Sequence, residues 1–162
     1  MRDSGLLRKD KFMSFLNSMN ISGSALTATR VRMDVIAENL ANMNTTRTAD
    51  GGPYRRRFVV FQEIENESRP GRTFNTFFNR ARGSAHGGVK VVSIGDDMSE
   101  FKYDFNPGHP DADENGMVAM PNIELVQEMT DMMAAFRAYE ANITALNTMK
   151  DMATRTLEIS SR

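Results

Sequence analysis

Residues 125–146, LVQEMTDMMAAFRAYEANITAL, decide the fold of this chain. Large apolar side chains recur along this stretch at alternating steps of four and three residues, the heptad spacing of a helix that packs against another helix. The members of this row are Leu125, Met129, Met132, Phe136, Tyr139, Ile143 and Leu146. Lys150 interrupts the row, and Ala153 resumes it. With Asn122 as the N-cap, the pattern predicts a helix from about residue 123 to residue 159.

A second row on the same predicted helix consists of small residues at steps of four, three and four: Ala134, Ala138, Ala141 and Ala145. Small side chains let another helix approach closely, and one partner cannot cover two faces of a helix. The row therefore predicts that at least three helices meet here and that the chain forms oligomers. The alternative is that alanine stands at these positions because it is a good helix former where side chains are exposed.

A second heptad row lies near the other end of the chain, and its members are Leu26, Thr29, Met33, Ile36, Leu40 and Met43. Gly23 and Ser24 predict the start of this helix, with a weak extension back towards Phe15, and the polar residues 42–46 predict its end. Residues 1–12 are mostly polar and show no apolar period, so we interpret residues 1–20 as a flexible lead-in.

The middle of the chain has a different character. Residues 57–64, 89–94 and 100–105 read as strands, residues 117–120 are strand-like, and the spacing of Phe74, Phe77 and Phe78 predicts one helical turn. We expect a small sheet or barrel there. The sequence thus predicts an α+β fold in four parts: a lead-in (1–20), an N-terminal coiled-coil helix (21–45), a β-rich middle domain (46–121) and a C-terminal coiled-coil helix (122–160).

The composition excludes several classes of protein. The 162 residues carry 20 basic and 21 acidic side chains, so no excess of positive charge is available for nucleic acid. There is no cysteine, which excludes disulfides and thiolate metal sites. Ser14, Asn17 and Asn20 interrupt the stretch after the basic N-terminus, so we expect neither a cleaved signal peptide nor insertion into a membrane.

One motif resembles a metal site. Asp111, Asp113, Asn115 and Gly116 match the first half of a calcium-binding loop. The twelfth position of that loop requires glutamate and is Asn122 here, so we expect an acidic turn instead.

Other candidate groups predict no chemistry. His86 and His109 lie in separate loops without ligand spacing. The arginines at 55–57 are interpreted as edging a strand or pairing across a subunit interface, in preference to a nucleic-acid patch. We therefore expect no catalytic residue, no metal and no cofactor.

Longer stretches carry a family resemblance. Residues 21–42, ISGSALTATRVRMDVIAENLAN, closely resemble the N-terminal signature of the flagellar rod and hook proteins. Residues 52–57 (GPYRRR) and 107–122 (PGHPDADENGMVAMPN) narrow the resemblance to the proximal-rod members, and RAYEAN at 137–142 fits them too. Residues 1–12, 68–85 and 98–106 depart from the family pattern.

The resemblance implies a structural subunit of the proximal rod that transmits motor torque, with the two terminal helices forming an inner layer. It implies export through the flagellar type III apparatus without signal cleavage and assembly in the periplasmic space. The implied partners are other proximal-rod subunits, the protein that joins the rod to the MS ring, the distal rod and copies of the chain itself. Another rod subunit and, more remotely, a periplasmic calcium-binding module are the alternatives.

Overall fold

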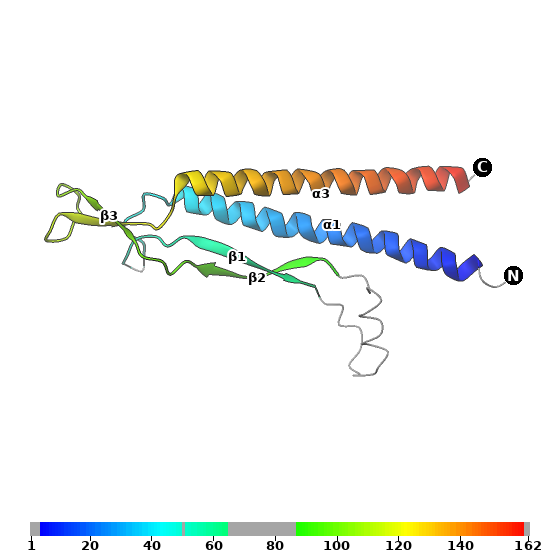
Figure 1. Ribbon diagram of the computed structural model, residues 1–162, viewed down its shortest axis with the longest axis horizontal. Coiled ribbons are helices and arrows are strands. Elements are labelled where there is room, and N and C mark those ends of the chain that lie inside the picture. Colours follow the sequence, from blue (N-terminus) through cyan, green and yellow to red (C-terminus); the bar gives the residue numbers. More distant parts are fainter. Residues whose placement is uncertain (1–3, 50, 65–86, 161–162) are drawn as a thin grey trace, which may run out of the picture. The chain divides into compact units, whose positions relative to one another are not determined.

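The computed structural model describes residues 4–49, 51–64 and 87–160, in which two long helices are separated in sequence by four strands (Figure 1). The predicted α+β class is confirmed. The elements are α1 (Ser4–Ala41), β1 (Arg57–Glu63), β2 (Val89–Asp96), β3 (Lys102–Phe105), β4 (Met117–Met120) and α3 (Leu125–Ser160). The helical turn predicted around Phe77 lies outside the described residues. None of the described helices is both long and apolar enough to cross a membrane.

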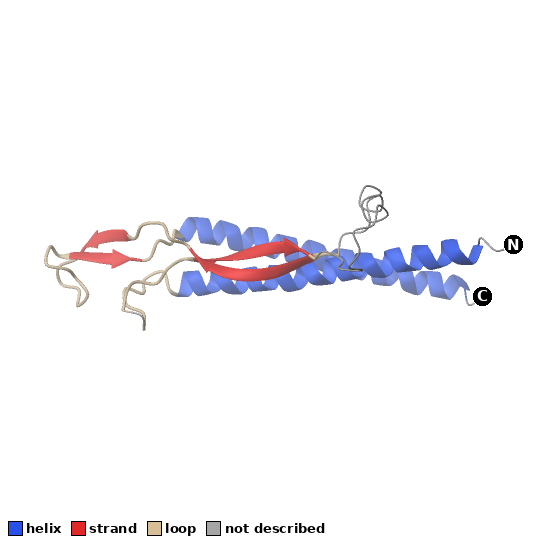
Figure 2. Cartoon of the chain, turned by 90° about the horizontal axis from the view of Figure 1, so that it is seen from below, coloured by secondary structure: helices blue, strands red, loops and turns tan. Residues whose placement is uncertain are grey.

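The described strands form two separate pairs, in place of the single small sheet or barrel that was predicted (Figure 2). β1 pairs with β2, and the N–H of Asp97 donates to the carbonyl of Arg56 at 2.7 Å at one end of this antiparallel pair. β3 and β4 are antiparallel, with Lys102 opposite Met120 and Phe105 opposite Met117. Two-stranded sheets are only marginally stable alone, so their faces need cover from other elements.

Helix α1 begins at Ser4, well before the predicted start, so the segment interpreted as a flexible lead-in is helical from that residue onward. Gly23 and Ser24 are in the interior of the helix. The hydroxyl of Ser24 donates to the carbonyl of Ile21 at 2.7 Å and accepts the N–H of Val89 at 3.1 Å. A Cβ on Gly88 would collide with the same hydroxyl. Ser24 and Gly88 therefore allow close approach between the start of β2 and α1, whereas a Cβ on Gly23 would meet nothing within 4 Å. The prediction that Gly23 and Ser24 start the helix was wrong.

The prediction of Asn122 as the N-cap of the C-terminal helix was also wrong, because α3 begins at Leu125. The side-chain oxygen of Asn122 accepts the backbone N–H of Arg56 at 2.9 Å, and its amide nitrogen donates to Ser99 Oγ at 2.8 Å. The side chain is thus occupied by two distant segments of the chain and does not cap the helix.

The chain divides into two compact units. One includes the described residues of Met1–Ala28, Phe61–Lys90 and Tyr139–Arg162, and the other comprises Thr29–Val60 and Val91–Ala138. These units cut across the four predicted segments, because α1, α3 and the β1–β2 pair each extend through both. The second unit, which we call the network unit, holds most of the buried core among the described residues: Val35, Ile36, Asn39, Val118, Ile123, Glu128 and Ala135.

Candidate assembly interface

The predicted heptad row of α3 is only partly covered by its own chain. Leu125, Met129 and Phe136 are exposed, the last two at 50% and 52%, whereas Met132, Tyr139, Ile143 and Leu146 are half-buried. Val126 and Met133 are exposed beside them at 72% and 55%. Exposed apolar patches of this kind are typical of protein–protein, membrane or ligand interaction sites. We call the five exposed residues the α3 row: Leu125, Val126, Met129, Met133 and Phe136.

The exposure of the α3 row follows from the rotation of the helix about its axis. The two fully covered residues on this part of α3 are Glu128, which is 0% exposed, and Ala135 at 2%. They are seven residues apart, so they share one face, and that face is turned towards the rest of the network unit. Because Met129 and Phe136 lie about 100° further around the cylinder, they point away from it.

The other predicted interface residues fall into two groups. In the alanine row, Ala134, Ala138 and Ala141 are exposed and Ala145 is half-buried. In the α1 row, Ile36 is buried, and the remaining members are half-buried: Leu26, Thr29, Met33, Leu40 and Met43. The N-terminal row is therefore largely used inside the chain, and the two rows of α3 offer the more open surfaces.

A buried polar network, which sequence reasoning missed, fixes the rotation of α3. The carboxylate of Glu128 accepts Arg56 Nε at 2.6 Å through Oε1 and Asn39 Nδ2 at 3.1 Å through Oε2. Arg56 also lies 3.7 Å from a carboxylate oxygen of Asp131 and 3.9 Å from one of Asp97. A charge-assisted hydrogen bond at such a buried site is strong, and an unpaired carboxylate there would be costly.

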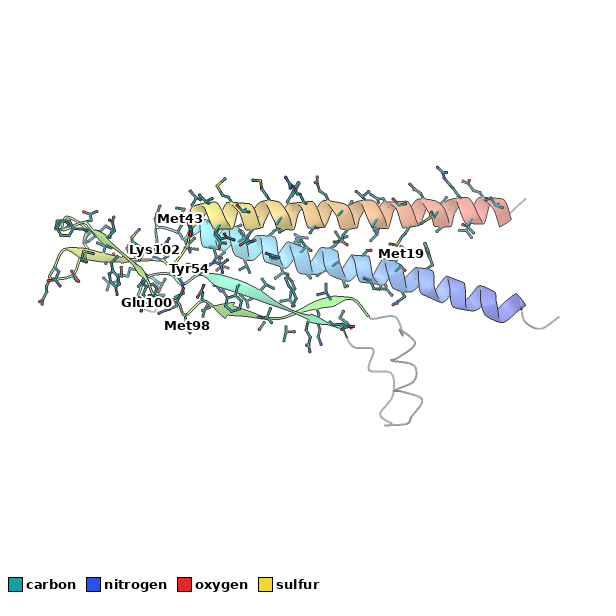
Figure 3. All side chains as sticks on the ribbon, in the orientation of Figure 1. Met19, Met43, Tyr54, Met98, Glu100 and Lys102 are labelled. Carbon is teal, nitrogen blue, oxygen red and sulfur yellow. The ribbon has the colours of Figure 1, made fainter. Side chains whose placement is uncertain are left out.

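Asn39 joins three segments of the network unit. Its Nδ2 donates to the carbonyl of Arg57 at 2.9 Å as well as to Glu128, and its Oδ1 accepts the N–H of Arg57 at 2.9 Å and the hydroxyl of Tyr54 at 3.2 Å. Tyr54 lies near the C-terminal end of α1 (Figure 3). All four hydrogen-bonding positions of the amide are used. Among the described residues, no buried side-chain nitrogen or oxygen lacks a partner.

The three consecutive arginines act within the chain. Arg56 holds Glu128, and Arg57 lies 2.8 Å from Glu38 on α1. Arg55 stacks over the ring of Phe101 at 4.1 Å, a cation–π contact. Pairing with Glu38 raises the pKa of Arg57 above its ordinary value. The cluster therefore connects the entrance of β1 to both helices.

Two further groups have shifted pKa values. Burial, with the nearby carboxylate of Glu38, raises the pKa of Tyr54 above 10.0. The backbone N–H of Ser99, which donates to Asp97 Oδ1 at 3.0 Å, lowers the pKa of Asp97 below 3.8. Both groups belong to the segments that surround the network.

The calcium-like motif forms a tight turn. Asp113 Oδ1 accepts the N–H groups of Asn115 at 2.9 Å and Met117 at 2.8 Å, and Gly116 has a φ of 75°. Asp111 accepts the hydroxyl of Thr46 at 2.9 Å. Within the described ranges, no group of three or more His, Asp and Glu side chains is arranged to hold a metal ion.

The two histidines have separate outcomes. His109 Nδ1 accepts the N–H of Asp111 at 3.1 Å, so this side chain has a local structural partner. His86 lies outside the described residues.

Two family models show the class of protein to which the chain is similar. The family model described as flagella basal body rod protein matches residues 19–47, and the model described as flagellar basal body rod FlgEFG protein C-terminal matches residues 114–159. The two matches include the α1 row and both rows of α3. The chain is thus of the class of flagellar rod proteins.

Relatives identify the family within that class. The chain is 42% identical over 152 residues to the flagellar basal-body rod protein FlgC of Borreliella burgdorferi, covering 91% of this chain and 98% of the relative. It is 43% identical to the FlgC proteins of Bacillus subtilis, over 154 residues with 91% and 99% covered, and of Salmonella typhimurium, over 147 residues with 91% and 98% covered. The chain belongs to the FlgC family of flagellar basal-body rod proteins.

This membership confirms the predicted function, a structural subunit of the proximal rod in the flagellar basal body. It also confirms that the chain is not an enzyme, because the family is a structural one. A rod protein assembles with other rod components and with itself. The surfaces through which it does so are the remaining question.

Proposed function

We propose that the chain transmits motor torque by packing the exposed faces of its helices against copies of itself and other rod proteins. The observation that carries the proposal is the α3 row, an apolar row on a helix whose buried face holds Glu128. A carboxylate inside and a phenylalanine outside invert the usual order of burial. The inversion is understandable if a partner covers the outer face.

The proposed interface comprises the predicted positions on both helices. On α1 it includes Leu26, Met33, Ile36 and Leu40. On α3 it includes Leu125, Met129, Met132, Phe136, Tyr139, Ile143 and Leu146 together with Ala134, Ala138, Ala141 and Ala145. The open positions of α3 support the proposal most directly, whereas Ile36 is already covered within the chain.

The polar network supports a mechanical role. Glu128 of α3, Asn39 of α1 and Arg56 before β1 are joined at 2.6 Å and 3.1 Å, so these segments of the network unit are held together. A fully satisfied buried polar network makes its surroundings rigid. A load that reaches one of these segments is then passed to the others instead of being lost in bending. No covalent bond is made or broken in this mechanism.

Family membership and the resemblance support the rest of the proposal. We place the chain in the periplasmic space, reached through the flagellar type III export apparatus without cleavage of a signal peptide. Its proposed neighbours are the other proximal-rod subunits, the protein that joins the rod to the MS ring, and the distal rod.

The test is an aspartate at the centre of the α3 row. Phe136→Asp should leave the isolated chain folded, because the side chain is already 52% exposed, and exposed substitutions change stability by about 0.5 kcal/mol or less. In the assembled rod the same charge would be buried without a partner, so we expect loss of incorporation into basal bodies and loss of swimming. Expression and circular dichroism of the purified chain check the first statement, and immunoblots of isolated basal bodies the second.

Thr130→Asp is the matched control, because Thr130 is exposed on α3 outside the row. This variant should be incorporated and should swim normally. Leu40→Asp should also abolish motility, but Leu40 is half-buried in the chain, so this change also disturbs folding. Normal incorporation of Phe136→Asp would refute the proposed interface.

A further inference from the structure

Asn115 and Gly116 belong to the calcium-like motif, and the proposed rod function does not use them. Both residues lie in the turn between β3 and β4, and Asn115 is the one asparagine of the chain that is followed by glycine. Asparagine is a chemically labile residue. It loses its amide most readily before glycine, because glycine has no side chain to keep its backbone nitrogen away from the asparagine amide carbon. Asn115 is exposed, so water can reach it.

The fold requires the glycine at position 116. Its φ is 75°, in the left-handed region that residues with a side chain rarely adopt. A Cβ at this position would also lie 3.1 Å from Phe105 Cε2 and 3.1 Å from Pro107 Cβ, which is tighter than an ordinary contact. The glycine that makes Asn115 reactive is therefore there for a structural reason.

The folded turn holds the nitrogen atom that would react. The N–H of Gly116 donates to the carbonyl of Asp113 at 3.0 Å, and Gly116 is buried. Asp113 Oδ1 accepts the N–H groups of Asn115 at 2.9 Å and of Met117 at 2.8 Å, so it fixes the backbone on both sides of Gly116. While these hydrogen bonds persist, the nitrogen of Gly116 is not free to approach the amide carbon of Asn115.

We infer that the Asn115–Gly116 peptide is a deamidation site that the closed turn protects, and that Asp113 is the residue that keeps the turn closed. The inference goes beyond the proposed function and does not depend on the α3 row. It gives the aspartate of the calcium-like motif a role that needs no metal ion.

The reaction consumes water and releases ammonia. The backbone nitrogen of Gly116 loses its proton and forms a bond to Cγ of Asn115, while the bond from Cγ to Nδ2 breaks and ammonia leaves with that proton. Water then opens the resulting cyclic imide. Attack at Cγ breaks the new bond and gives aspartate, whereas attack at the backbone carbonyl carbon gives isoaspartate, in which the main chain passes through Cβ and Cγ. Nothing is oxidised or reduced.

Isoaspartate at position 115 would prevent the turn from closing again. The carbonyl of Gly116 accepts the N–H of Asn106 at 2.9 Å, and the N–H of Asp113 donates to the carbonyl of Met117 at 2.9 Å. A main chain lengthened by a methylene group between these partners cannot keep both distances. The end of the β3–β4 pair, where Phe105 lies opposite Met117, would then open.

The test follows position 115 by peptide mass spectrometry. The purified full chain is incubated in mildly alkaline buffer with and without urea, and the fractions of asparagine, aspartate and isoaspartate at this position are measured over time. Because the reaction in buffer must wait for local opening, we expect deamidation to be about tenfold slower there than in urea, or slower still. Hydrogen exchange at the N–H of Asn106 reports the closure of the turn in the same samples.

Asp113→Ala removes the side-chain acceptor and keeps the backbone carbonyl. Because two hydrogen bonds are lost, we expect deamidation in buffer about tenfold faster than in the unchanged chain, with faster exchange at Asn106. Asp113→Asn retains a side-chain oxygen that accepts both N–H groups, so its rate should stay close to that of the unchanged chain. Glu114→Ala is the matched control, because Glu114 is exposed in the same turn, and it should leave the rate unaltered. Circular dichroism checks that each variant keeps its helices.

Equal rates in buffer and in urea would overturn the inference, since the folded turn would then give no protection, and this comparison needs no variant. Absence of deamidation in urea would show that Asn115–Gly116 is not such a site. If Asp113→Ala reacted no faster than Glu114→Ala, Asp113 would not be the residue that holds the turn closed. Incorporation of Phe136→Asp into basal bodies tests the proposed function separately.

Discussion

Replacing the Asn39 amide by a carboxylate is the sharpest test of the polar network. Asn39→Asp keeps the size and shape of the side chain and exchanges Nδ2, a donor, for an oxygen. Nδ2 donates to the carbonyl of Arg57 at 2.9 Å and to Glu128 Oε2 at 3.1 Å. In the variant, an oxygen faces each of these two acceptors, and one of them is itself a carboxylate.

The expected loss of stability can be worked out from these contacts. Two hydrogen bonds disappear, each contributing about 1 kcal/mol. Two carboxylates about 4 Å apart repel by about 4 kcal/mol at the effective dielectric constant of a partly buried site. Arg56 Nε, at 2.6 Å from Glu128, offsets part of this repulsion. We expect the free energy of unfolding to fall by about 3–5 kcal/mol at neutral pH, a large fraction of the total stability of a small protein.

The measurement is urea unfolding of the purified full chain, followed by circular dichroism, together with hydrogen exchange at the backbone N–H of Arg57. That N–H donates to Asn39 Oδ1 at 2.9 Å, so its protection reports directly on the network. Asn44→Asp is the matched control, because Asn44 is exposed just beyond the end of α1, and this variant should unfold like the unchanged chain. If Asn39→Asp and Asn44→Asp were equally stable, the network would not hold the unit together.

Three further predictions concern pH and backbone geometry. Because the pKa of Tyr54 is raised above 10.0 in the folded chain, its contribution to stability is present below about pH 10 and is lost as the pH rises through the folded-state value; Tyr54→Phe should flatten this part of the alkaline unfolding curve. Because the pKa of Asp97 is lowered below 3.8, its contribution is present above that value and is lost as the pH falls through the folded-state pKa, so Asp97→Asn should remove this part of the acid destabilisation. Gly88→Ala should destabilise the chain more than Gly51→Ala in the same urea assay: both glycines have positive φ, 103° and 89°, but only Gly88 would collide with Ser24. Equal losses in the two glycine variants would show that backbone strain alone is responsible.

The sequence predicted the two helices and the ends of most elements, because apolar spacing of 3.5 residues and clusters of turn residues are local signals. It did not predict the true start of α1. The local sequence around Ser24 is the same whether this residue starts a helix or holds a strand against one, and the hydrogen bond from the N–H of Val89 to Ser24 shows the second role. That contact joins residues 65 positions apart, and no local pattern reports it.

The candidate interface shows the same limit. Heptad spacing identified Phe136, Met129 and their neighbours as one face, but spacing cannot say whether the chain itself or a partner covers that face. The answer depends on Glu128 and Asn39, which are 89 residues apart in sequence and meet only in the fold. A signal was present, since Glu128 precedes Ala135 by one heptad and three arginines stand at 55–57. Neither feature alone indicates that Arg56 and Glu128 form a buried ion pair.

The burial of Glu128 and the exposure of the α3 row separate folding of the subunit from its assembly into the rod. Fully covering a large apolar side chain stabilises a structure by about 1.5–3 kcal/mol. The members of the α3 row are 43–72% exposed, so a large part of this free energy is unused in the single copy. Among the described residues, the buried polar contacts of the network unit are complete without a partner. The subunit can therefore keep its local geometry while its apolar row is open, and the row contributes its free energy only when a neighbour covers it. Folding of the unit and growth of the rod then depend on different interactions. Asn39→Asp should therefore impair folding, and Phe136→Asp should impair incorporation into the rod.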